Sequence, residues 1–140
     1  MAITLVGLGG CSEKRSQPLA IDNSLTQEEI AAGVLSPEVM WKMGRVGLAS
    51  LSPDASRLLY TVTWYNMQEN RGVTAIYVRD AASGEVAQLT DFSSNNSDPK
   101  WNADGSKIYF LSDLSGSSQI WEMAADGQNP RQLSKLDKDI

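Results

Sequence analysis

A ten-residue pattern occurs twice in this chain, and the spacing of its copies restricts the folds that the chain can adopt. Residues 51–60 read Leu-Ser-Pro-Asp-Ala-Ser-Arg-Leu-Leu-Tyr, and residues 101–110 read Trp-Asn-Ala-Asp-Gly-Ser-Lys-Ile-Tyr-Phe. Residue types match at an offset of 50. Two later segments match at an offset of 44: 76–78 with 120–122, and 88–90 with 132–134. The six-residue difference predicts a longer loop between Tyr60 and Ile76.

Each copy consists of short apolar runs separated by turn residues. A period near 44 residues of this kind is typical of the four-stranded blades of a β-propeller. Asp54 and Asp104 can form Asx-turns, and Gly105 tolerates positive φ. We therefore predict an all-β fold of two four-stranded antiparallel blades, an incomplete propeller. The expected strands are 46–51, 57–63, 74–79 and 86–90 in the first blade, and 99–102, 107–112, 119–123 and 131–134 in the second.

Two blades alone leave two sheet faces without a neighbouring blade. Repeat folds generally need about three units before burial outweighs chain entropy. Apolar positions on the expected strands are assigned to the core and to packing between blades: Leu58, Tyr60, Ile76, Tyr77, Trp101, Ile108, Phe110, Ile120 and Trp121.

Two short helices are predicted before the first blade. Thr26 and Glu29 form a capping-box pattern, and Gly33 is placed to end that helix. Ser36 followed by Pro37 marks the start of a second helix, which ends before Gly44.

Adjacent Glu28 and Glu29 could bind an ammonium group, but capping and the helix dipole already explain both acids. They are not assigned to a site. The expected division of the chain is a signal and linker over 1–23, a helical lead-in over 24–45, and blades over 46–95 and 96–140.

The composition excludes several kinds of chemistry. The chain has no histidine and one cysteine, so it cannot hold a Ser-His-Asp relay, a His-ligated zinc or an internal disulfide. Its net charge of −5 disfavours nucleic-acid binding, and no apolar run is long enough to cross a membrane. The repeated Asp54 and Asp104 lack the further carboxylates of a calcium loop. No cofactor, metal or catalytic residue is expected.

The segment Leu8-Gly9-Gly10-Cys11 resembles the lipobox at the end of a bacterial lipoprotein signal peptide. A basic region and a full-length apolar run are missing before it, which a start codon placed too far downstream would explain. The alternative is an ordinary N-terminus with one unmodified cysteine. A functional lipobox implies a periplasmic or cell-envelope protein, anchored by lipid on Cys11.

The repeat resembles the TolB-like, WD-related propeller repeat, with its S-P-D-G turn, I-Y-V or I-W strand, D-G turn and L-T ending. Ala55 and Ala103 are the departures. Residues 35–46 resemble the start of the propeller in bacterial prolyl oligopeptidase-family serine peptidases, of the dipeptidyl-peptidase or acylaminoacyl-peptidase type. The resemblance implies a propeller that caps an α/β-hydrolase domain and admits small peptides. No catalytic residue can be carried over, because the chain has no G-x-S-x-G segment.

Three functions follow as hypotheses. The first is the N-terminal propeller part of a serine exopeptidase, either as a fragment or as a truncated gene product. Its partners are then further blades, a C-terminal hydrolase domain and a peptide substrate. The second is a non-catalytic cell-envelope propeller that acts as a binding scaffold. The third is a 140-residue protein that closes its ring by oligomerising.

The long loop of the first repeat is the candidate contact for a partner domain or a substrate, because long propeller loops often form binding surfaces. A solvated insertion without a role is the alternative. The candidate residues are Tyr65, Asn66, Gln68, Glu69, Asn70 and Arg71.

Overall fold

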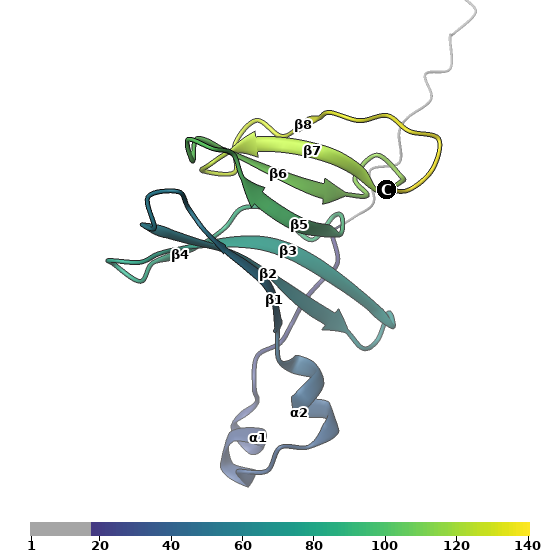
Figure 1. Cartoon of the computed structure of the whole chain (residues 1–140). Coiled ribbons are helices and arrows are strands. Elements are labelled where there is room, and N and C mark those ends of the chain that lie inside the picture. The colour runs from purple at the N-terminus through teal and green to yellow at the C-terminus, as the bar shows by residue number, and fades with distance from the viewer. Residues whose placement is uncertain (1–17) are drawn as a thin grey trace, which may run out of the picture.

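The computed structural model describes residues 18–140 and forms two four-stranded antiparallel sheets behind two short helices (Figure 1). The helices are α1 (Gln27–Ala32) and α2 (Pro37–Lys42). The first sheet contains β1 (Arg45–Leu51), β2 (Arg57–Asn66), β3 (Arg71–Asp80) and β4 (Val86–Gln88). The second contains β5 (Asn96–Trp101), β6 (Lys107–Ser112), β7 (Gln119–Ala124) and β8 (Arg131–Gln132). Strand order follows chain order in both sheets, which confirms the predicted fold class.

The helices begin where the local sequence predicts. The Thr26 side chain accepts a hydrogen bond from the Glu29 N–H, and the Glu29 carboxylate accepts one from the Thr26 N–H, so the capping box is confirmed. Gly33 ends α1 with a left-handed φ of 60°. Met43 ends α2 in an extended conformation, and Gly44 has no positive φ. Gly44 therefore serves a purpose other than a left-handed cap, described below.

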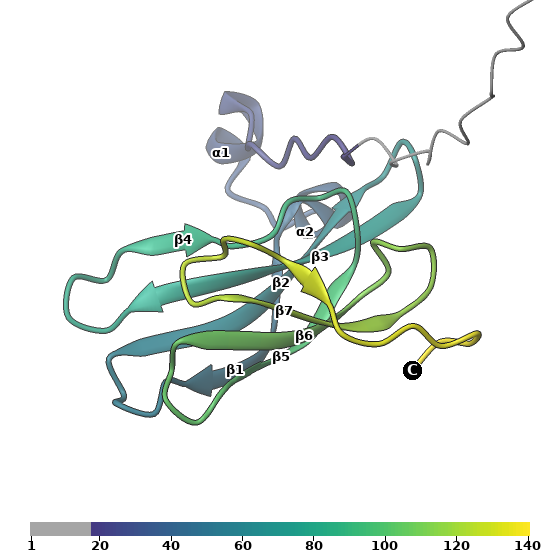
Figure 2. The ribbon, with the colours of Figure 1, turned by 90° about the horizontal axis from the view of Figure 1, so that it is seen from above.

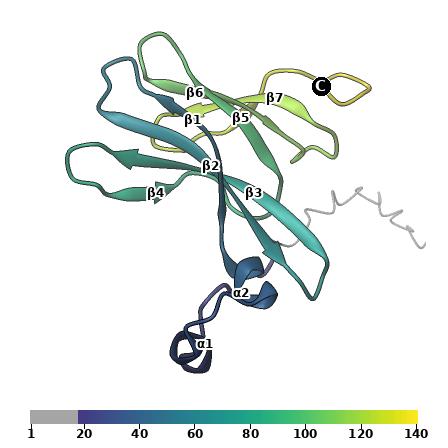
Figure 3. The same cartoon turned by 60° about the horizontal axis from the view of Figure 1, so that its bottom comes forward.

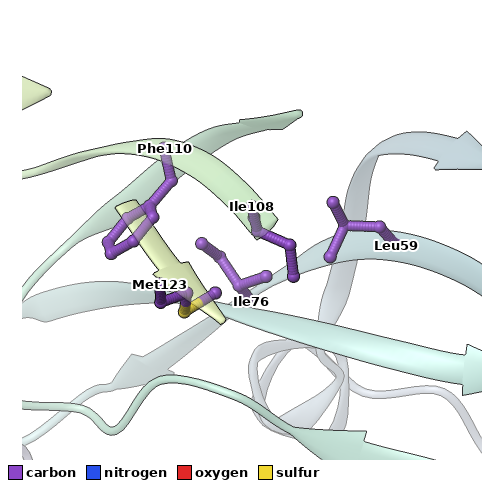
Figure 4. Packing of buried hydrophobic residues seen from close by; sticks show 5 residues of the cluster. All are labelled: Leu59, Ile76, Ile108, Phe110 and Met123. Atoms are coloured by element: carbon purple, nitrogen blue, oxygen red, sulfur yellow. The ribbon is translucent and has the colours of Figure 1, made fainter. Parts of the chain in front are cut away.

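The second sheet stacks on one face of the first (Figures 1 and 2). The edge strand β5 of the second sheet contacts β1, β2 and β3 of the first. Leu59 and Ile76 of the first sheet meet Ile108, Phe110 and Met123 of the second in a core where no side chain is more than 4% exposed (Figure 4). Full burial of one such side chain contributes about 1.5–3 kcal/mol. This contact holds the two sheets together.

The predicted core positions divide among three environments. Three lie in the buried core: Ile76, Ile108 and Phe110. Two pack against the core and stay partly exposed: Trp101 and Trp121. Four lie on the outward sheet faces: Leu58, Tyr60, Tyr77 and Ile120. Two buried residues were not assigned to the core from the sequence, Leu59 and Met123, which are 0% and 2% exposed. Neighbouring strand residues point to opposite faces, so an apolar pair such as Leu58 and Leu59 does not show which member is buried.

Each sheet exposes apolar side chains on its face away from the other sheet, although at the hairpin end of the first sheet Val62, Val73 and Ala75 on that face are buried. Val46 and Leu51 of the first sheet are 70% and 59% exposed, and their register places them on the face away from the second sheet. Tyr109 and Ile120 on the outer face of the second sheet are 37% and 38% exposed. These exposures agree with the expectation that two blades leave two apolar faces without a neighbour.

The prediction of a long loop in the first repeat is wrong, because most of the extra residues extend the two strands β2 and β3. β2 and β3 pair over ten residues each, whereas β6 and β7 pair over six. The connecting turn covers only 67–70. Residues 61–65 are Thr-Val-Thr-Trp-Tyr, all of which favour strands, and the Thr63 and Thr74 hydroxyls hydrogen-bond across the ladder at 2.8 Å. The insertion is thus a projecting hairpin.

Matching turns of the two sheets carry different residues at the position with left-handed φ, Ala55 in the first and Gly105 in the second. Ala55 has a φ of 56° and Gly105 has a φ of 73°. A left-handed conformation costs a non-glycine residue about 1–2 kcal/mol, and glycine loses about 0.4–1 kcal/mol through the greater entropy of the unfolded chain. We expect Ala55→Gly to raise the free energy of unfolding by about 0.5 kcal/mol, measured by urea denaturation.

Gly105→Ala is the reciprocal control and should lower the free energy of unfolding. The new alanine would have to keep the left-handed φ of 73°, and its Cβ would lie 3.3 Å from Pro53 Cδ. Equal effects of the two substitutions, in size and sign, would show that backbone strain at this turn does not contribute to stability.

Candidate interaction surface at the β2–β3 hairpin

The end of the β2–β3 hairpin lies beside the helical lead-in. α1 and α2 are at the same end of the first sheet as this hairpin (Figure 3), and α2 contacts β2. Residues 41–45, at the junction of α2 with β1, face the hairpin residues around Tyr65. The lead-in and the hairpin therefore form one surface.

A stacked arrangement of Trp41, Arg45 and Tyr65 joins the two parts of this surface. The Arg45 guanidinium carbon lies 4.5 Å from the centre of the Trp41 ring and 4.4 Å from that of Tyr65. The two rings meet edge to face, with their centres 5.2 Å apart. A cation over an aromatic face contributes about 0.5–1 kcal/mol at an exposed site. The arginine thus fixes the angle at which the chain leaves α2 and enters β1.

Two glycines allow the close approach of these elements. A Cβ on Gly44 would lie 2.7 Å from Val62 Cγ1 and 2.8 Å from the Trp64 ring. A Cβ on Gly72 would lie 2.9 Å from Tyr65 Cε1. Both distances are too short for real carbon atoms. Gly44 therefore lets the lead-in cross the first sheet closely, and Gly72 lets the Tyr65 ring lie over β3.

Hydrogen bonds hold the hairpin turn against the segment that precedes α1. The Asn66 amide donates to the Ala20 carbonyl at 2.8 Å, and its oxygen accepts from the Glu69 N–H at 2.9 Å. Arg71 Nη1 lies 3.7 Å from Glu69 Oε2, with both side chains about half exposed. An exposed ion pair of this length contributes little. The Arg71 guanidinium therefore keeps most of its donors available.

A hollow of about 150 Å³ opens at this tip. Four of the six predicted contact residues line it: Tyr65, Asn66, Asn70 and Arg71. Gln68 and Glu69 belong to the turn but do not line the hollow. Three lining residues were not identified from the sequence: Trp41, Met67 and Gly72. Trp41 and Arg45 flank Gly44 in the sequence, but only the fold shows that they meet Tyr65.

A wider hollow of about 340 Å³ lies between the sheets, above Phe110 and Met123. The buried side chains of Ser94, Asn96 and Ser112 line it and hydrogen-bond to one another at 3.3–3.4 Å. Its floor belongs to the core described above, so we assign this hollow to packing between the sheets.

The repeated aspartates serve the turns. Asp54 Oδ1 accepts hydrogen bonds from the Ser52 hydroxyl at 2.6 Å and from the Ser56 N–H at 3.1 Å. These bonds, the Ser52 bond first, lower the pKa of Asp54 to about 2. Asp104 likewise accepts from the Ser106 N–H at 2.8 Å. Within residues 18–140, no three His, Cys, Asp or Glu side chains come together as a metal site.

The acids of the lead-in have structural partners as well. Glu29 caps α1 and pairs with Lys42 at 2.8 Å, and the Lys42 hydrogen bond is the main cause of its lowered pKa. Cys11 lies outside the described residues, so its lipidation stays a prediction. No helix within residues 18–140 is long and apolar enough to span a bilayer.

Comparison with known proteins identifies relatives over most of the chain. The model of the TolB beta propeller domain matches residues 25–139. Dipeptidyl-peptidase 5 of Porphyromonas endodontalis is 31% identical over 116 residues, which cover 82% of this chain and 17% of the relative. The chain thus matches about a sixth of the length of that curated relative.

Solved structures show the same fold. A TolB-type protein from Agrobacterium tumefaciens is 29% identical, with a TM-score of 0.51 over 64% of this chain and 31% of that one. The acylaminoacyl peptidase of Pyrococcus horikoshii is 18% identical, with a TM-score of 0.58 over 69% of this chain and 15% of that one.

The stacked arginine gives a testable expectation. Arg45→Met keeps an unbranched side chain but removes the charge that contacts both rings, and should lower the free energy of unfolding by about 1 kcal/mol. Arg71→Met, on the adjacent β2–β3 hairpin, is the matched control, since Arg71 stacks on no ring within residues 18–140, and should change stability by less than about 0.5 kcal/mol. Equal losses in urea denaturation would contradict a specific contribution from the stack.

Proposed function

The chain belongs to the TolB beta propeller domain family, and from this premise we propose that it is the N-terminal propeller part of a larger serine peptidase of the prolyl oligopeptidase family. The proposal rests on the 31% sequence identity with dipeptidyl-peptidase 5, in an alignment that covers 82% of this chain. In this role the blades restrict the access of peptides to an α/β-hydrolase domain. The substrate is a small peptide.

The uncovered sheet faces support a ring with further blades. Val46 and Leu51 on one face, and Tyr109 and Ile120 on the other, are apolar and exposed at opposite sides of the stacked pair. Covering them would add apolar burial of the kind that already joins the two sheets. A neighbouring blade on each side is the simplest cover.

The projecting hairpin supports a contact with another domain. Ordinary blade turns stay close to the sheet, whereas this hairpin extends the ladder and is fixed by the arginine stack. Tryptophan, tyrosine, methionine and arginine gather at its tip, and these residue types are enriched at interfaces. In the proposed peptidase, this tip contacts the hydrolase domain or a bound peptide.

The proposal is tested on the complete reading frame and its product. The frame that contains this chain should continue past Ile140 through more blades to a G-x-S-x-G segment and then to Asp and His. The complete product should release the chromophore from a dipeptidyl reporter and leave a folded protein substrate intact. The 140-residue chain alone should show no turnover, because it has no histidine to act as a base. Turnover by the chain alone would overturn the proposal.

A non-catalytic scaffold in the cell envelope is the second candidate. The 29% identity to the TolB-type structure favours it. It requires a reading frame with further repeats and a stop before any hydrolase domain. The same sequencing experiment therefore separates the two functions.

We further propose that the protein is held at the cell envelope through lipid on Cys11. The support is the sequence Leu8-Gly9-Gly10-Cys11 followed by a polar stretch. Radiolabelled palmitate should enter the protein when its gene is expressed with its native upstream sequence. Cys11→Ser should abolish the label, since the chain has no other cysteine, and Ser12→Ala should retain it. Absence of label from the parent protein would contradict the anchor.

A further inference from the structure

We propose that the hollow at the tip of the β2–β3 hairpin is a binding subsite for a carboxylate group. The inference is independent of peptidase activity, because it depends on the chemistry of the hollow alone. The lining residues combine hydrogen-bond donors with flat apolar walls, and the local charge is opposite in sign to the net charge of the chain.

The hydrogen-bonding groups of the hollow are mainly donors. A guanidinium carries five N–H groups and cannot accept, and that of Arg71 has only the long contact to Glu69 at 3.7 Å. Within the described residues, the Asn70 amide and the Trp41 indole N–H have no hydrogen-bond partner in the protein. The Asn66 oxygen, which could accept, is already bonded to the Glu69 N–H. A ligand that only accepts hydrogen bonds suits these groups best.

The charge around the hollow also favours an anion. Two guanidinium groups, of Arg71 and Arg45, lie at this tip, whereas Glu69 is the carboxylate that faces Arg71. The Glu69 side chain is 48% exposed and its ion pair is weak, so a ligand can replace it. Arg45 cannot turn away freely, because its guanidinium packs on the rings of both Trp41 and Tyr65. The tip therefore forms a small cationic spot on a chain of net charge −5.

The size and walls of the hollow select among anions. Its volume of about 150 Å³ corresponds to roughly five waters at ~30 Å³ each. That volume is enough for one short side chain or a chain end. Trp41, Tyr65 and Met67 provide apolar surface beside the donors. Methylene groups of a carboxylic acid can pack on that surface while the carboxylate pairs with Arg71 in bidentate geometry. Inorganic phosphate can form the same pair but has no methylene groups to pack.

Two sources can supply this group, an acidic side chain or the free C-terminus of a peptide. N-acetyl-glutamic acid amide carries only the side-chain carboxylate, and N-acetyl-alanine carries only the terminal one. Each is titrated into the ¹⁵N-labelled 140-residue chain, and the Trp41 indole N–H signal is followed by NMR. The signal is assigned by its absence in Trp41→Phe.

We expect a saturable shift of the Trp41 signal with at least one of the two acids, and the acid that binds identifies the source. The neutral N-acetyl-glutamine amide and inorganic phosphate should bind at least tenfold more weakly. Arg71→Gln should weaken binding of the acid at least tenfold, whereas Arg79→Gln, at the other end of β3, should leave it unchanged. Arg71→Lys, which keeps the charge but not the fork, should give an intermediate affinity.

The proposal is overturned if neither acid gives a saturable shift, if the neutral amide binds as well as the acid, or if Arg71→Gln binds as the parent does. If Arg71→Gln loses its dispersed spectrum, the comparison of Arg71→Lys with Arg79→Gln decides the matter. Equal binding by those two variants would then exclude the subsite. Loss of peptidase activity in the complete protein plays no part in this test.

Discussion

The contact between the two sheets is the constraint on which the rest of this structure depends. Leu59 and Ile76 on one side, and Ile108, Phe110 and Met123 on the other, exclude water from a single shared core. A lone four-stranded sheet has no second layer against which to bury a face, and so gains little from forming. Stacking also sets the positions of both outer faces, because strand side chains alternate with a period of two. When one face of each sheet is buried, the alternate apolar side chains of the same strands lie on the outer face, where a further blade would pack.

A second interaction attaches the helical lead-in to this stack. Both helices have only six residues, and such helices are marginal without tertiary contacts. Their caps define where they begin, but Val39 is the one helical residue among them that is buried. The Arg45 stack and the close approach at Gly44 supply the missing contacts. The lead-in and the projecting hairpin are therefore in direct contact and form one surface.

The acids and the hairpin tip of this chain have different tasks. Asp54 and Asp104 serve turns, Glu29 serves a cap and an ion pair, and the side chains at the hairpin tip donate hydrogen bonds or provide apolar surface. Such groups suit the role proposed above, in which the propeller restricts the access of peptides to a hydrolase domain. The chain belongs to the TolB beta propeller domain family and is 31% identical to dipeptidyl-peptidase 5 over 116 residues.

The sequence by itself determined the secondary-structure elements. The repeat predicts the eight strands, the capping box predicts the start of α1, and Asp54 and Asp104 predict the turns between strands. These follow from interactions between residues close in the chain, which a linear pattern records. The tertiary structure alone decided which of Leu58 and Leu59 is buried, how the extra residues of the first repeat became strand, and that Trp41, Arg45 and Tyr65 meet. Those outcomes depend on the packing of segments distant in the chain, and local propensity carries no information about which distant surface a side chain will face.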